Sequence, residues 1–223
     1  MPNWCVQNWI LKGPKDDVQR FCDTVNSCLV KPDVKPNGFG KFWLGNLCVA
    51  FGYEYSDTKS GLRGNFDPDE SCCATLCHPE PEEKAITPLS IDGDTSEIRF
   101  SVTHAWGPSD WFQEMVDEQF PDLEQAWKAT DEFGNFHACR GLEAFGMKKY
   151  EVDPWGEAGE WKCFGDGEEQ QAADYLNKIT GRTEDPITAD EILYDEDAVN
   201  EKLGAYNEEN EDDCVYLHVW KEE

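Results

Sequence analysis

The sequence WCVQNWILK spans residues 4–12 and runs directly into Gly13 and Pro14. Its β-branched and aromatic residues, ending at a glycine, are typical of a strand. Pro14 suits the first turn of a helix, and four apolar residues then recur at the i, i+3, i+4, i+7 spacing of one buried helical face: Val18, Phe21, Cys22 and Val25. The chain is therefore predicted to open with a strand that leads straight into a helix ending near Cys28.

A second set of elements lies further along the chain. Asp92-Gly93 is a turn signal between two strands, and Ser109 is a suitable N-cap for a helix that Pro121 ends. The predicted elements are strands over 86–91 and 97–105, a helix over 110–120, and strands over 123–131 and 135–141.

Strand, helix, strand, strand, helix, strand is the order of the split β-α-β arrangement in ferredoxin-like folds. The predicted class is α+β, with an antiparallel sheet that carries its helices on one face. A long insertion at about 29–85 interrupts the order. Within it, the short apolar run at 42–52 fits either a helix or a strand, and a helix is favoured. Residues 53–84 have few periodic apolar positions and are read as irregular.

Acidic residues are distributed unequally along the chain. Residues 150–223 hold 23 Asp and Glu against 5 Lys and Arg, a net of −18, while residues 1–149 have a net of −10. We therefore predict a core over 1–149 and an acidic α+β extension over 150–223 that packs on the same sheet. Its predicted elements are strands over 146–152 and 159–164, a helix over 168–179, a helix from the capping box at Thr188 to about Gly204, and a strand over 214–220.

The net charge of −28 limits the partners of the protein. Such a surface repels nucleic-acid phosphate and anionic lipid and attracts basic proteins or cations. No stretch approaches the roughly 20 apolar residues of a membrane span, and the N-terminus has no secretory pattern. We expect a cytoplasmic protein with reduced cysteines that serve as small core residues, and a protein partner, with basic or DNA-binding proteins as candidates.

Metal and catalytic chemistry have few candidates. Cys72, Cys73, Cys77 and His78 could ligate zinc, but no second Cys pair follows, so a loop with incidental thiols is favoured and no cofactor is predicted. No P-loop, GxSxG or HExxH pattern occurs, and nucleophilic catalysis would need Cys139 or Cys163 beside a histidine. No catalytic residue is assigned.

Trp106-Gly107-Pro108-Ser109 lies where a predicted strand passes into a helix. One interpretation is a binding corner with an exposed indole, and the other is a tight turn with a buried tryptophan. The candidate ligand- or partner-binding residues are Asn3, Trp4, Arg63, Trp106 and Arg140.

Four segments together resemble the YubB-like proteins of phages, plasmids and conjugative elements: MPNWCVQNWILKG at 1–13, WLGNLCVAFG at 43–52, THAWGPSDW at 103–111 and DEFGNFHACRG at 131–141. The family often has a Pro pair after the tryptophan, where this chain has Gly107-Pro108. The resemblance, which covers residues 1 to about 152, implies a ferredoxin-like domain encoded by a mobile element and located in a bacterial cytoplasm. It carries over no catalytic residue.

These observations predict a non-catalytic accessory or interaction protein. The alternative is an acidic DNA mimic that inhibits a host nucleic-acid-processing or defence enzyme. A duplex as long as this protein is wide, about 45 Å, carries about 26 charges, close to the 28 here. Direct nucleic-acid binding is disfavoured because 19 basic residues stand against 47 acidic ones, and an enzyme of unknown type would require a cleft lined with Cys and His.

Overall fold

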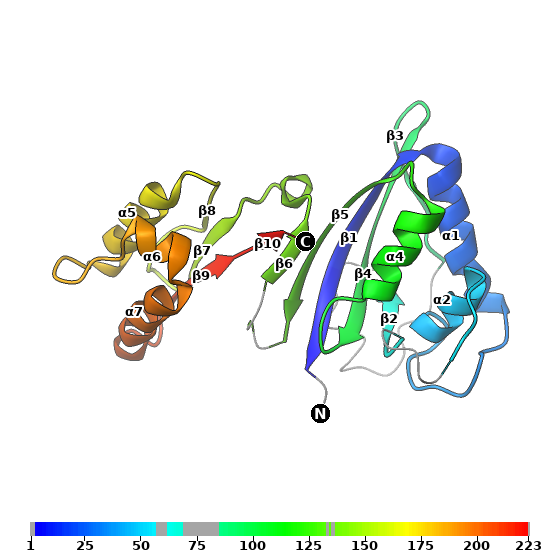
Figure 1. The fold of residues 1–223 in the computed structure, drawn as a ribbon, viewed down its shortest axis with the longest axis horizontal. Coiled ribbons are helices and arrows are strands. Elements are labelled where there is room, and N and C mark those ends of the chain that lie inside the picture. The colour runs from blue at the N-terminus through cyan, green and yellow to red at the C-terminus, as the bar shows by residue number, and fades with distance from the viewer. Residues whose placement is uncertain (1–2, 57–61, 69–84, 133, 135–136, 223) are drawn as a thin grey trace. The chain divides into compact units, whose positions relative to one another are not determined.

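The computed structural model describes residues 3–56, 62–68, 85–132, 134 and 137–222 (Figure 1). The chain forms two compact units, Met1–Gly141 and Leu142–Glu223, so the boundary precedes the one expected after residue 149. The residues between belong to the second unit because Lys148 and Lys149 pair there with Glu168 and Asp166, at 2.8 and 2.6 Å. Whether the acidic extension packs on the sheet of the core stays a prediction.

The N-terminal unit confirms the α+β class. Its sheet has the order β6-β5-β1-β4-β2, β3 also pairs with β4, and neighbouring strands are antiparallel. The elements are β1 (Trp4–Pro14), α1 (Lys15–Val30), α2 (Leu44–Ala50), β2 (Gly64–Asp67), β3 (Leu89–Asp92), β4 (Thr95–Ala105), α4 (Asp110–Gln119), β5 (Glu124–Asp131) and β6 (His137–Arg140). The predicted opening strand and helix, the helix within 42–52 and the helix after Ser109 are all confirmed.

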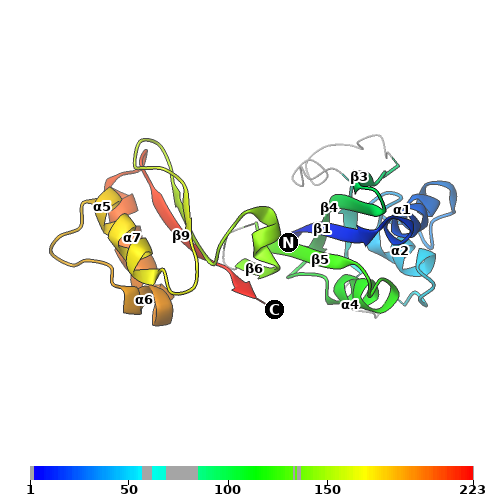
Figure 2. The same ribbon diagram turned by 90° about the horizontal axis from the view of Figure 1, so that it is seen from above.

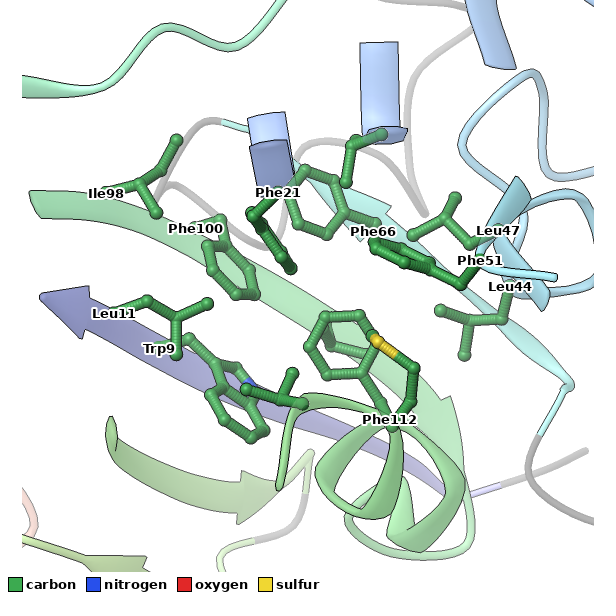
Figure 3. Close-up of a cluster of buried hydrophobic side chains, with 14 of the residues drawn as sticks. Trp9, Leu11, Phe21, Leu44, Leu47, Phe51, Phe66, Ile98, Phe100 and Phe112 are labelled. Carbon is green, nitrogen blue, oxygen red and sulfur yellow. The ribbon is translucent and has the colours of Figure 1, made fainter. Parts of the chain in front are cut away.

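An aromatic core joins the sheet to α1 and α4. Trp9 on β1 lies opposite Phe100 on β4 and Trp127 on β5, and all three rings are buried. Phe21 from α1 and Phe112 from α4 pack onto these rings, and Figure 3 shows both side chains pointing at Phe100. One face of the sheet is therefore buried under both helices, as the helical spacing predicted.

The prediction that residues 53–84 are irregular was wrong at β2. β2 lies inside this range, pairs with β4, and places Phe66 in the core, where its ring stacks on Phe100 with centroids 4.6 Å apart. A strand of four residues with a single large apolar side chain has too little alternation to be recognised from sequence.

The C-terminal unit has a sheet of its own, with the strand order β8-β7-β9. Its elements are η1 (Leu142–Phe145), β7 (Tyr150–Pro154), β8 (Lys162–Phe164), α5 (Glu169–Thr180), α6 (Ala189–Tyr194), α7 (Glu196–Glu209), β9 (Val215–Val219) and β10 (Lys221–Glu222). Figure 2 shows α5, α6 and α7 on one side of β9. Tyr150, Val152 and Leu176 belong to the hydrophobic core of this unit.

The single helix expected from Thr188 to Gly204 is two helices. The capping box is confirmed, since Thr188 Oγ1 accepts from the Glu191 amide and the Glu191 carboxylate accepts from the Thr188 amide. The chain leaves the helical conformation at Asp195, whose φ is −144° and whose side chain accepts from the Ala198 amide. Asp195 thus ends α6 and caps α7, because a short carboxylate satisfies the free amides of a helix start.

Cysteines behave as small core residues in the N-terminal unit. Cys5, Cys22, Cys28, Cys48 and Cys139 are buried, and burial raises the pKa of Cys22 to about 12 and that of Cys28 to about 11. Such thiols stay protonated at neutral pH and are poor nucleophiles. The two predicted core cysteines of the C-terminal unit, Cys163 and Cys214, are only half-buried.

Candidate functional site

Four of the five predicted binding residues meet at one end of the N-terminal sheet. Trp4 on β1 lies opposite Ala105 on β4, and the Ala105 amide donates to the Arg63 carbonyl at 3.0 Å. The Trp106 amide donates to the Asn3 carbonyl at 2.7 Å. Backbone hydrogen bonds therefore bring Asn3, Trp4, Arg63 and Trp106 together, and we call this group the Trp106 corner.

Trp106 has an unusual backbone. Its φ is +80°, the only positive value among the described non-glycine residues, and its side chain is 67% exposed. A bulky residue held in this region costs about 1–3 kcal/mol, and persists only where its surroundings impose it. The tight turn that the sequence predicted is present, but the indole is exposed, so the buried-tryptophan interpretation was wrong.

Trp4 and Arg63 form a second layer of the corner. The guanidinium of Arg63, an exposed residue, lies 5.9 Å from the centre of the Trp4 ring, which is cation–π distance. The edge of Phe39 packs against the same Trp4 ring, with centroids 6.0 Å apart and planes at 73°. Phe39 thus helps to hold a half-buried tryptophan beneath an exposed arginine.

Asn3 ties the corner to β5. Its Nδ2 donates to the carboxylate of Asp131 at 2.6 Å, and the neighbouring Glu132 amide donates to the Trp4 carbonyl at 2.8 Å. The Asn3 Oδ1 atom is buried and has no hydrogen-bond partner within the described residues. A buried acceptor without a partner costs about 1–3 kcal/mol.

His104 lies directly before the corner. Its Nδ1 is 2.9 Å from the Gly107 carbonyl oxygen, and because a carbonyl only accepts, Nδ1 carries the proton. Nε2 is then an acceptor, and it is buried with no hydrogen-bond partner within the described parts of the chain. Burial lowers the pKa of His104, while the Gly107 hydrogen bond and the charge of Asp110 oppose that shift. His104 is therefore neutral at neutral pH.

The lowered pKa of His104 predicts a pH-dependent stability. The unfolded chain takes up the proton near the ordinary histidine pKa of about 6.5, and the folded chain takes it up only at lower pH. The His104 contribution is thus complete above pH 6.5 and is lost as the pH falls below it. Urea unfolding at neutral and mildly acidic pH should show a smaller loss in His104→Asn, which keeps a donor towards Gly107 but does not titrate. His218→Asn, in the other unit, is the control, and an equal loss in His104→Asn and wild type would contradict the assignment.

Arg140 lies elsewhere. It is on β6 opposite Trp127, and its Nη1 donates to both carboxylate oxygens of Asp117 near the end of α4, at 3.1 and 3.2 Å. This position is remote in register from the Trp4 end of β1. Arg140 is therefore not part of the Trp106 corner, and its proposed role in binding stays a prediction.

The sequence did not point to three residues that support the corner. His104 lies within the strand predicted over 97–105 and was not singled out as a site residue, and neither Phe39 nor Asp131 was considered. Asp131 could have been noticed as an acid at the end of an alternating strand that faces the aromatic core. Phe39 follows two prolines and a glycine in irregular chain, and no periodic signal marks it.

Two other kinds of site can be checked on the described residues alone. Among them, no group of three or more His, Cys, Asp and Glu side chains is placed to hold a metal ion. Cys72, Cys73, Cys77 and His78 lie outside the described residues. Within the same residues, no helix combines the length and the apolar character that crossing a bilayer requires.

No protein-family model matches the sequence, and no match was found among curated proteins or solved structures.

Proposed function

We propose that this protein is a non-catalytic interaction factor and that the Trp106 corner is the surface through which it holds a protein partner. The observation that carries this proposal is an indole that is 67% exposed and attached to a backbone with φ +80°. Folding gains little from an exposed ring, yet the fold accepts the strain of positioning it. Binding a partner is a function that accounts for both facts.

The composition of the corner supports the same conclusion. Tryptophan and arginine are the residues that most often dominate binding energy in protein interfaces, because both offer large areas that lose water on contact. The corner holds Trp106 and Arg63 exposed, and the half-buried Trp4 ring lies 5.9 Å from the Arg63 guanidinium. Its backbone is fixed by strand pairing, so a partner would meet a preorganised surface.

The finer fold and family assignments belong to this proposal. β1 and β4 lie at the centre of the sheet with β5 and β2 outside them, which supports a ferredoxin-like core. The resemblance of the four sequence segments supports a YubB-like protein of a mobile element that acts in a bacterial cytoplasm.

The acidic extension favours a second candidate function. With a net of −18 over residues 150–223, the protein could present carboxylates to a DNA-binding enzyme as duplex DNA presents phosphates. This DNA mimic would bind through many acids and would depend little on Trp106. The two functions therefore differ in which substitutions remove the partner.

Replacing Trp106 by glycine tests the proposal. Glycine accepts φ +80° without strain, so Trp106→Gly should be about 1 kcal/mol more stable than Trp106→Ala in urea unfolding, although it should lose the partner. Quantitative affinity capture from a bacterial lysate should show the same proteins lost from both variants. Val30→Ala, which removes an 88% exposed side chain from α1, is the matched control and should retain them. Retention of every captured protein by Trp106→Gly would exclude the corner as the interface.

A further inference from the structure

A second surface lies on the C-terminal sheet, on the face turned away from its helices. Side chains alternate along β7 and β9, so that Tyr150, Val152 and Leu217 enter the core under α5, α6 and α7. Glu151 and Asp153 point to the opposite face, as does Tyr216, which pairs with Asp153. The three helices α5, α6 and α7 lie together on the other side of β9 (Figure 2).

Indole N–H groups donate hydrogen bonds to the carboxylates of this face. Glu151 accepts from Trp161 Nε1 at 2.8 Å and from Trp220 Nε1 at 2.9 Å, one bond to each carboxylate oxygen. Asp153 accepts from Trp155 Nε1 at 3.3 Å. We call this set the indole–carboxylate face, and it comprises Glu151, Asp153, Trp155, Trp161, Tyr216 and Trp220.

Three of the four aromatic side chains of this face are open to solvent, while Trp220 is buried. Trp155 is 60% exposed, Trp161 51% and Tyr216 39%. Trp155 packs against Tyr216 edge to face, with centroids 5.7 Å apart, and the His218 ring lies parallel to Tyr216 at 6.4 Å. The N–H edges of the indoles already donate hydrogen bonds, so what Trp155 and Trp161 offer to a ligand is their ring faces, which carry partial negative charge.

The charge of the face is not neutralised from within. Four of the six described lysines of this unit pair with other acids: Lys148 with Glu168, Lys149 with Asp166, Lys202 with Asp185 and Glu191, and Lys221 with Glu196. Lys162 lies 4.1 Å from the centre of the Tyr175 ring on the helix side. Among the described residues, neither Glu151 nor Asp153 has a lysine or arginine partner. The face thus combines two carboxylates with exposed rings in a unit of large negative charge.

We propose that the indole–carboxylate face binds arginine side chains of a basic, extended segment of a partner protein. A guanidinium stacks on aromatic rings and donates two parallel hydrogen bonds to a carboxylate, so one side chain can use both features of the face. Ring and carboxylate attract the same charge, and the net of −18 over residues 150–223 steers a basic segment towards it. A lysine offers a single charge point without the planar fork, and it binds this face more weakly.

This surface is independent of the Trp106 corner. It lies in the other unit, and its argument uses no residue of the corner. Substitutions on it leave the corner unchanged, so either proposal can fail while the other stands.

The test measures fluorescence anisotropy of a labelled peptide of alternating arginine and glycine, titrated with the full chain at about 0.15 M salt. A lysine–glycine peptide of equal length is the matched probe and should bind more weakly. Trp155→Ala and Asp153→Asn should each weaken arginine-peptide binding about 10-fold, as the loss of a cation–π contact or of a charge-assisted hydrogen bond implies.

Two substitutions on the same unit serve as controls. Glu209→Gln removes one charge from the end of α7, and Tyr194→Ala removes an exposed ring from α6, both away from the face. Each should change the affinity less than about twofold, as expected for remote exposed groups. Equal losses in Asp153→Asn and Glu209→Gln would show binding by bulk charge alone, and either that result or equal affinity for both peptides would overturn the proposal.

Discussion

Replacing Phe100 by alanine is expected to lower the free energy of unfolding of the N-terminal unit by about 3–5 kcal/mol. Phe100 is fully buried at the centre of β4. Its ring stacks on Phe66 at 4.6 Å and on Phe21 at 5.4 Å, and Trp9 lies parallel to it at 6.0 Å. The substitution therefore leaves a cavity where rings from two other strands and a helix meet, and rigid rings do not collapse well into such a space.

Hydrogen exchange measured peptide by peptide is the appropriate readout, because it reports the stability of each unit separately. Phe100→Ala should speed exchange in the slowest peptides of β1, β4 and α1. Peptides of α5 and α7 should keep their wild-type rates, since their core is a separate cluster. Leu203→Ala, which opens a cavity in that second core, should show the reverse pattern. Faster exchange in both units from either substitution would show that they unfold as one.

The sequence predicted most of the N-terminal fold because its signals are local. The alternation of Ile98, Phe100 and Val102 is typical of a strand, and these residues lie on β4, where all three side chains are buried. The Ser109 cap is present, with its side chain accepting from the Phe112 amide. Such patterns depend only on residues that are close in the sequence. They can therefore be recognised without knowing what the strand or helix packs against.

Some features of the fold could not be predicted because they depend on residues that are far apart in the sequence. The role of β2 is set by its pairing with β4 and by the contact of Phe66 with Phe100, neither of which leaves a periodic trace in four residues. Asp195, where one helix was expected, was missed for a different reason, because its cap on Ala198 is local. A break that caps the next helix resembles an ordinary acidic position in a sequence with so many acids.

Only part of the candidate site could be predicted from the sequence, because strand pairing decides which residues meet. Asn3, Trp4 and Trp106 lie in segments that resemble a family, and backbone pairing places them together. Arg140 lies in another such segment but pairs with Asp117 instead. Tyr216, in contrast, lay in a strand whose alternation was recognised. Its exposed face became informative only when β7 placed Glu151 and Asp153 beside it.

Gly64→Ala should destabilise the N-terminal unit by about 3 kcal/mol, at the upper end of what forced overpacking costs. A Cβ atom at Gly64 would lie 1.8 Å from the Thr103 carbonyl oxygen and 2.8 Å from its carbonyl carbon, both in the backbone of β4. No rotamer change relieves a clash with backbone, so β2 must move away from β4. That movement disturbs the pairing of Gly64 with His104 and the packing of Phe66.

Gly38→Ala is the matched control for this substitution, because a Cβ atom there meets nothing within 4 Å. Its stability in urea should stay within about 0.5 kcal/mol of wild type. Gly64→Ala should also weaken partner capture, since Arg63 precedes β2 and its carbonyl accepts from the Ala105 amide next to Trp106. Equal stability of the two alanine variants would contradict the close approach of β2 to β4. If Gly64→Ala is destabilised but captures the partner as well as the wild type does, β2 does not support the Trp106 corner. The Trp106 backbone would then be held by the Asn3 carbonyl alone.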